Sequence, residues 1–132
     1  MALPFVEQAS THAHDDRSVM QYALLIYTAE DVSPESRRET ATAVAPVLER
    51  PNVRTWARLH AAQTATTVRL VEGETLLTDG PFVDSKEFLG GLVIIDADNL
   101  DEALAVAAEL QAMRSGGAIE VRPVLEEPLR GR

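Results

Sequence analysis

Apolar and polar positions along the chain fall into blocks that alternate between the periods of strands and helices. Met20 to Tyr27 (MQYALLIY) is rich in apolar and aromatic residues and predicts a buried strand. A helix is predicted next, with Ser33 as its N-cap and Pro34 at the first helical position, where the missing N–H costs nothing. Pro46 is predicted to end or kink this helix about three turns later.

Four further strands, two of them in a hairpin, are predicted in the middle of the chain. Residues 52–60 (NVRTWARLH) alternate, which places Val53, Thr55, Ala57 and Leu59 on one face and Arg54, Trp56 and Arg58 on the other. Residues 65–80 contain a hairpin that turns at residues 72–74. Residues 88–98 (FLGGLVIIDAD) are continuously apolar, as is typical of a central strand covered on both faces, and Gly90 and Gly91 indicate a bulge or a close backbone approach there.

A second helix and a last strand complete the pattern. Asn99 is the predicted N-cap of the helix, and Glu102 stands three residues on, as in a capping box. Residues 115–117 (SGG) end this helix, and residues 118–124 (AIEVRPV) form the last strand. The order of elements predicts an α+β fold, a ferredoxin-like βαββαβ arrangement with an inserted hairpin.

Two helices can cover only one face of such a sheet. The opposite face would expose apolar residues over several hundred Å², which a soluble monomer rarely does. We therefore expect two copies to pair through these faces as a homodimeric α+β barrel. Residues 1–19 read as a polar N-terminal extension, residues 20–124 as the domain, and residues 125–132 as a loose C-terminal tail.

Composition narrows the function classes. The 12 basic and 21 acidic residues give a net charge of −9, which argues against a nucleic-acid partner because phosphate binding rests on Lys and Arg. No segment is long and apolar enough to span a bilayer, and the N-terminal residues lack the basic and apolar regions of a secretory signal, so we expect a cytoplasmic protein without a membrane partner.

No cofactor or metal is predicted. The absence of cysteine excludes disulfides, thiolate nucleophiles, zinc fingers and iron–sulfur clusters. His12 and His14 lie in the polar extension, where nothing preorganises them as metal ligands. The sequence also has no recognisable nucleotide-binding loop or Ser-His-Asp motif.

The stretch TLLTDGPF (residues 75–82) is the main candidate site. An Asp in a turn usually accepts a hydrogen bond from the amide two residues on, but Pro81 has no N–H, so Asp79 must find a later loop amide, an arginine, Lys86 or a ligand. Pro81 stiffens the loop, and Phe82 is expected to anchor it on apolar surface. The loop is therefore either a structural turn or a rigid device that presents one acid to a ligand.

His60 is the candidate partner of Asp79 in acid/base catalysis, because histidine gains and loses a proton near neutral pH. The alternative interpretation, which the sequence favours, is a lone histidine at the surface or rim of the fold. Candidate ligand-binding residues are Gly80, Pro81, Phe82, Arg58 and Lys86. Lys86 also fits a solvated charge cluster with Asp84 and Glu87, and Arg58 fits a cross-strand ion pair.

Several segments together resemble the YCII-related family, in its DGPF-motif branch: MQYALLIY, TATTVRL, the long run from GETLLTDGPF through DEALAVAAEL, and GAIEVRPV. The resemblance covers residues 20–124 and implies a dimeric α+β barrel. Family members usually carry a glycine-rich GG-E-L segment where this chain has TWARLH, so Trp56 and Ala57 replace the glycines and Arg58 replaces the acid. If the glycines make room for a ligand, Trp56 narrows that space.

Three functional hypotheses follow. The first is a homodimer that binds a small organic molecule in a pocket near the DGPF loop. The second, which the resemblance implies through lyase-type relatives, is a small acid/base enzyme that uses Asp79 and His60. The third is an accessory or regulatory protein, implied because DGPF proteins are often encoded beside extracytoplasmic-function sigma factors.

Overall fold

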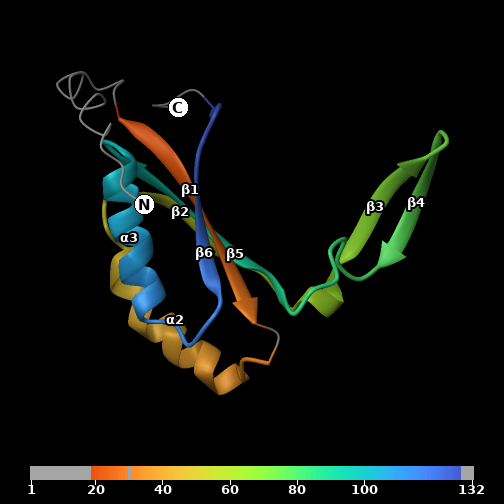
Figure 1. Cartoon of the computed structure of the whole chain (residues 1–132), viewed down its shortest axis with the longest axis horizontal. Coiled ribbons are helices and arrows are strands. Elements are labelled where there is room, and N and C mark those ends of the chain that lie inside the picture. The colour runs from red at the N-terminus through yellow and green to blue at the C-terminus, as the bar shows by residue number, and fades with distance from the viewer. Residues whose placement is uncertain (1–18, 30, 129–132) are drawn as a thin grey trace.

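A computed structural model of the chain describes residues 19–29 and 31–128, so the predicted extension, with His12 and His14, lies almost wholly outside the described residues. The elements follow one another in the predicted order (Figure 1). They are β1 (Met20–Ala29), α2 (Pro34–Leu48), β2 (Val53–Arg58), the 3-10 turn η3 (Ala62–Thr64), β3 (Thr66–Val71), β4 (Glu74–Asp79), β5 (Glu87–Ala97), α3 (Leu100–Ala112) and β6 (Ala118–Pro123).

Four strands form one antiparallel sheet in the order β2-β5-β1-β6, and β3 and β4 form a separate two-stranded sheet. This order is the ferredoxin-like one, with the β3–β4 hairpin inserted between the two βαβ halves. The predicted α+β class, the ferredoxin-like order and the inserted hairpin are therefore confirmed.

Both helices begin at the predicted caps. The Ser33 hydroxyl oxygen accepts a hydrogen bond from the Ser36 amide at 3.1 Å, and the Asn99 side-chain oxygen accepts one from the Glu102 amide at 3.0 Å. The Glu102 carboxylate accepts from the amide of Asp98, one residue before the cap. The predicted end at Pro46 is wrong, because α2 continues to Leu48, where burial of the final turn holds the helix together.

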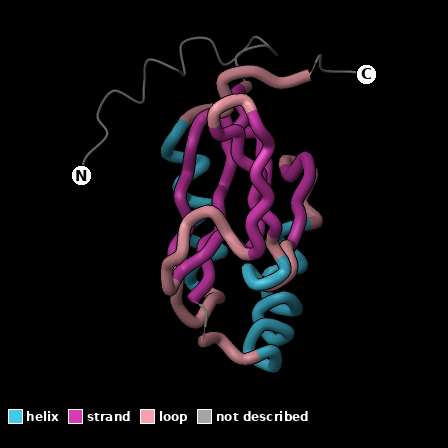
Figure 2. Tube along the Cα trace, turned by 90° about the vertical axis from the view of Figure 1, so that its right-hand side faces the viewer, coloured by secondary structure: helices cyan, strands magenta, loops and turns pink. Residues whose placement is uncertain are grey.

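The core lies between the two helices and one face of the sheet. Both helices are on the same side of the sheet, and a view from the hairpin side has the strands in front and α2 and α3 behind them (Figure 2). The largest fully buried side chains are Leu24, Ile95, Leu110 and Val47. The expectation that β5 is covered on both faces is wrong for the single chain, since Leu92 and Ile94 are only partly buried on the face without helices.

Two irregularities shape the sheet beside α2. The β1–β5 pairing shifts from Ile26 opposite Gly91 to Tyr27 opposite Leu89, so Gly90 is the extra residue of the predicted bulge. A Cβ on Gly91 would lie 2.8 Å from the Ala57 carbonyl oxygen, which confirms the predicted close approach. The β2–β5 pairing shifts between Val53 and Thr55. Val53 therefore packs against the core, and the single face predicted for Val53, Thr55, Ala57 and Leu59 is broken.

The β3–β4 hairpin, which we call the arm (residues 66–79), projects away from the four-stranded sheet (Figure 1). Its turn falls at the predicted place, with Glu72 and Gly73 both at positive φ, 51° and 83°. A two-residue turn of this kind matches the twist of a hairpin. Val68, Leu70 and Leu77 share one face of the arm, because Val68 stands opposite Leu77 and Leu70 lies two residues further on. All three are exposed.

Candidate functional site

An apolar pocket of about 150 Å³ lies between α2 and the four-stranded sheet. Its walls come from the end of β1, one face of α2, the strands β2 and β5, and the loop after α3. Ile26, Val44, Phe88 and Val93 are among the apolar side chains that line it. The bulge at Gly90 belongs to the same wall, and a Cβ there would lie 2.6 Å from the Thr28 hydroxyl oxygen, so the close approach of β1 requires a glycine.

Side-chain contacts hold α2 near both of its ends, and the helix lies over the pocket between these contacts. Near its start, the hydroxyls of Ser36 and Ser115 are 3.3 Å apart. After its end, Arg50 forms a bidentate ion pair with Glu109 of α3, with one N–O distance of 3.0 Å. These contacts hold α2 to α3 and to the loop that follows α3, so α2 stays in place over the pocket.

Arg114 is positioned in the pocket wall by the turn after α3. Its guanidinium donates to the carbonyl of Tyr27 at 2.9 Å and to the side-chain oxygen of Gln111 at 2.8 Å. Gly117 allows this approach, since its φ is +73° and a Cβ there would lie 2.1 Å from the Tyr27 carbonyl oxygen. Burial lowers the pKa of the Arg114 guanidinium, which nevertheless stays protonated at any physiological pH.

Trp56 and Arg58 form the wall contributed by β2. They are two residues apart on one face of the strand, and the Arg58 guanidinium lies 4.7 Å from the centre of the Trp56 ring. This stacking restrains a side chain that would otherwise be free to rotate. Trp56 therefore lines the pocket without closing it.

The predicted site residues are not gathered in one place. Arg58 lines the pocket, whereas Asp79, Gly80, Pro81 and Phe82 do not, so in the single chain the pocket is not at the DGPF loop. The Asp79 carboxylate is exposed, and within residues 19–29 and 31–128 no group donates a hydrogen bond to it. The loop is instead held through the backbone of Gly80, whose amide donates to the Ala65 carbonyl at 2.7 Å and whose carbonyl accepts from the Thr67 hydroxyl at 2.8 Å.

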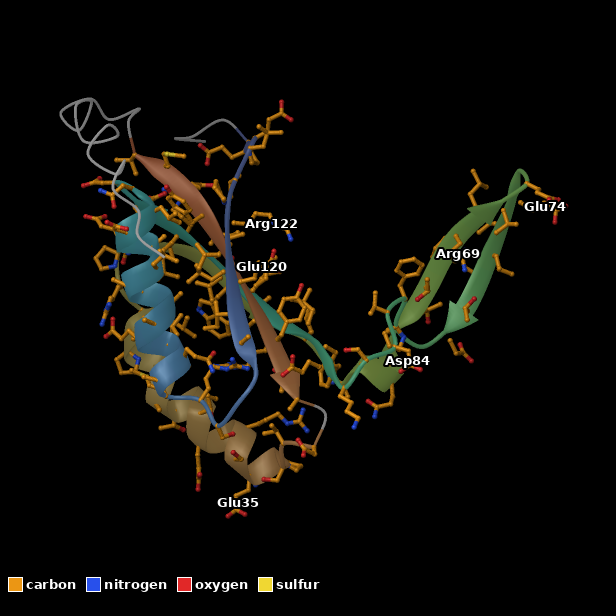
Figure 3. All side chains as sticks on the ribbon, in the orientation of Figure 1. Glu35, Arg69, Glu74, Asp84, Glu120 and Arg122 are labelled. Carbon is orange, nitrogen blue, oxygen red and sulfur yellow. The ribbon has the colours of Figure 1, made fainter. Side chains whose placement is uncertain are left out.

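Phe82, His60 and Lys86 are also found on exposed positions. Phe82 is 70% exposed and lies beneath the guanidinium of Arg69, so it does not anchor the loop on apolar surface of its own chain. His60 follows β2 and has no hydrogen-bond partner in the part of the chain that the structure describes. Lys86 lines a shallow depression with Asp31 and Glu87, outside the pocket. Figure 3 shows Arg69 on the arm and Asp84 at its base.

Two charged residues of the pocket, Arg37 and Arg114, were not among the sequence candidates. Arg37 stands on the same stripe of α2 as Ala41, Val44 and Leu48, at helical spacing, and all four line the pocket. A charged residue on an otherwise apolar stripe was a signal that pattern analysis could have used. Arg114 had no such signal, because its place depends on a turn that brings residues far apart in sequence together.

The described residues hold no group of three or more His, Asp or Glu side chains arranged to bind a metal ion. No helix among them is long and apolar enough to cross a membrane.

Comparison with known proteins places the chain in a protein family. Among models of protein families, that of the YCII-related domain matches residues 20–128 of the chain. The chain is also 37% identical over 114 residues to an uncharacterized protein of Rhizobium meliloti (strain 1021), and this similarity covers 80% of the chain and 92% of the relative. The family match agrees with the resemblance carried by the sequence motifs.

Proposed function

This chain belongs to the YCII-related family, and we propose that it acts as a homodimer that binds a small organic molecule in the pocket beneath α2. The size and the lining of the pocket are the observations that support this proposal. The pocket's volume of about 150 Å³ is comparable to that of a protein cavity known to take up benzene, so one aromatic or aliphatic ring fits it. Apolar walls with a few polar groups at fixed positions are the usual form of a small-molecule site.

Binding is favoured over acid/base catalysis by what lines the pocket. An acid/base enzyme needs a proton donor or acceptor within reach of its substrate. Neither Asp79 nor His60 lines the pocket, and the described lining residues include no other histidine or carboxylate. The polar groups of the pocket are arginines and hydroxyls, which orient a ligand and do not exchange protons with it near neutral pH.

The homodimer is supported by two apolar surfaces that the single chain leaves uncovered. One is the sheet face without helices, where Leu25, Leu92 and Ile94 are adjacent in register, and the other is the arm face of Val68, Leu70 and Leu77. The arm lies on the same side of the sheet as this open face (Figure 1). A lone two-stranded hairpin is marginally stable in water, so we infer that a second copy covers both surfaces.

Filling the pocket tests the binding proposal. Ala41→Phe places a ring in the pocket, while Ala43→Phe places one on the exposed side of the same helix as a matched control. In a thermal-shift screen of single-ring compounds, we expect ligands that stabilise the wild type and Ala43→Phe but not Ala41→Phe. Compounds that stabilise all three proteins equally, or a screen without any stabilising compound, would overturn the proposal.

A charge on the arm tests the homodimer. Leu77→Asp puts a carboxylate on the apolar face of the arm, and Thr78→Asp puts the same charge on the opposite face. Sedimentation at micromolar concentration should give a dimer for the wild type and Thr78→Asp and a monomer for Leu77→Asp. A monomeric wild type, or a Leu77→Asp variant that stays dimeric, contradicts the proposed interface.

A further inference from the structure

We propose that the ligand of this pocket is a small organic anion, with a carboxylate or phosphate group held by Arg58 and Arg114 and a single-ring apolar body held by the remaining wall. This inference rests on the proposed function, because it specifies the chemical class of the molecule that the pocket binds. It starts from an imbalance of charge. The chain has 21 acidic and 12 basic residues, yet the pocket is lined by three arginines and, among the described residues, by no aspartate or glutamate.

The pocket arginines differ from three of the five described arginines outside the pocket. The other two, Arg38 and Arg69, also have no carboxylate partner among the described residues. Arg50, Arg54 and Arg122 each pair with a carboxylate. Figure 3 shows one of these pairs, Arg122 with Glu120 on β6. Arg37, Arg58 and Arg114 have no carboxylate partner in residues 19–29 and 31–128. Their positive charge is therefore left to solvent or to a ligand.

Arg114 carries most of the inference. It is partly buried, and within the described part of the chain its hydrogen bonds go only to neutral groups: the Tyr27 carbonyl, the Thr28 hydroxyl and the Gln111 side chain. A charge that is partly removed from water without an opposite charge is unfavourable. The lowered pKa of this guanidinium has burial as its cause, in contrast to Arg50, whose pKa the Glu109 carboxylate raises. An anion in the pocket would offset the lost solvation.

Arg58 supplies a second, oriented guanidinium. Stacking on Trp56 leaves the edge of the guanidinium free, and two parallel N–H groups on that edge match the two oxygens of a carboxylate or phosphate. Arg58 comes from β2 and Arg114 from the loop after α3, and both line the same cavity of about 150 Å³. Arg37 adds a third positive charge from α2. The apolar remainder, including Ile26 and Phe88, accommodates the body of the ligand.

The fluorescence of Trp56 can be used to measure ligand binding in the pocket. This residue is the only tryptophan of the chain and lines the pocket, so its fluorescence reports on occupancy. The probes are benzoate and benzyl alcohol, which share a ring and differ in charge, together with phenyl phosphate. We expect benzoate to bind at least about tenfold more tightly than benzyl alcohol, because only the anion gains charge-assisted hydrogen bonds. The tighter of benzoate and phenyl phosphate identifies the preferred anionic group.

Variants locate the effect. Arg58→Gln should weaken benzoate binding about tenfold and change benzyl alcohol binding much less, since the charge-assisted contact is made only with the anion. Arg38→Gln removes the same charge from an exposed α2 position outside the pocket and should change neither.

Three outcomes would contradict the proposal. If benzyl alcohol binds as tightly as benzoate, the ligand is not an anion, but the proposed function still stands. If Arg58→Gln and Arg38→Gln lose the same amount of benzoate affinity, Arg58 is not part of an anion site. If no probe changes the fluorescence or gives heat in calorimetry, both proposals are overturned.

Discussion

Leucines in two strands of this chain have opposite surroundings. Leu24 of β1 is fully buried, whereas Leu70 of β3 is 74% exposed. The first lies in the body, which consists of the four-stranded sheet and the two helices, and the second lies in the arm. The body covers one face of its strands with α2 and α3, but the arm has only its own two strands and one turn.

The comparison shows that forming a strand and burying it are separate events. In the arm, the Glu72-Gly73 turn and cross-strand pairs specify a hairpin without any buried core. In the body, most of the stabilisation comes from apolar area removed from water. Mutations in the body should therefore act on the fold, and mutations on the arm face should act on association.

The largest expected effect comes from comparing a Leu→Ala substitution in the body with the same substitution in the arm. Leu24→Ala empties a fully buried site and should lower the free energy of unfolding by about 2–5 kcal/mol. Leu77→Ala removes a side chain that is 64% exposed and should cost less than about 0.5 kcal/mol in dilute protein. Urea unfolding followed by circular dichroism measures both.

Protein concentration sharpens this test. If the arm face is covered by a second copy, the cost of Leu77→Ala should grow as the concentration rises, because the lost contact lies between two chains. The difference between Leu24→Ala and the wild type at any fixed concentration should remain large. A Leu77→Ala cost that does not depend on concentration would place the covering surface within the same chain.

A smaller effect is expected at the base of the arm. The Asp79 carboxylate accepts no hydrogen bond within the described residues, so Asp79→Asn and Asp79→Ala should change the free energy of unfolding by less than about 0.5 kcal/mol. Thermal melts of the two variants and the wild type provide the measurement. A loss of more than about 1 kcal/mol in both variants would mean that the carboxylate clamps the loop in solution.

The smallest effect concerns the tie between the body helices. The Arg50 guanidinium holds the pKa of the Glu109 carboxyl below its ordinary value through hydrogen bonding. A lowered pKa stabilises the fold above the pKa of the unfolded state, and this contribution is lost as the pH falls through the folded value. Glu109→Gln should lower the melting temperature at neutral pH by no more than about 2 °C, because the pair is exposed. The difference between variant and wild type should disappear in acid; a constant difference would assign the effect to packing.

The candidate site was only partly accessible to sequence analysis. Asp79 drew attention because Pro81 denies it the usual local hydrogen bond, and the structure leaves that carboxylate exposed beside a loop held by backbone. Arg58 was a candidate and does line the pocket. Arg114 was missed, since its approach to Tyr27 joins residues 87 positions apart and requires Gly117 at positive φ. Local patterns do not encode such a contact.

The sequence by itself determined the order of elements, the caps at Ser33 and Asn99, the turn at Glu72-Gly73 and the bulge at Gly90. Each depends on residues close together in the chain, through periodicity, short-range hydrogen bonds or allowed backbone angles. Tertiary structure decided which strand faces are buried and where the pocket lies. Burial depends on surfaces that segments far apart in the sequence contribute. The packing of α2 and α3 on one side of the sheet gathers Arg37, Arg58 and Arg114 around a single cavity. The same packing leaves the arm without a covering layer, so its apolar face is exposed.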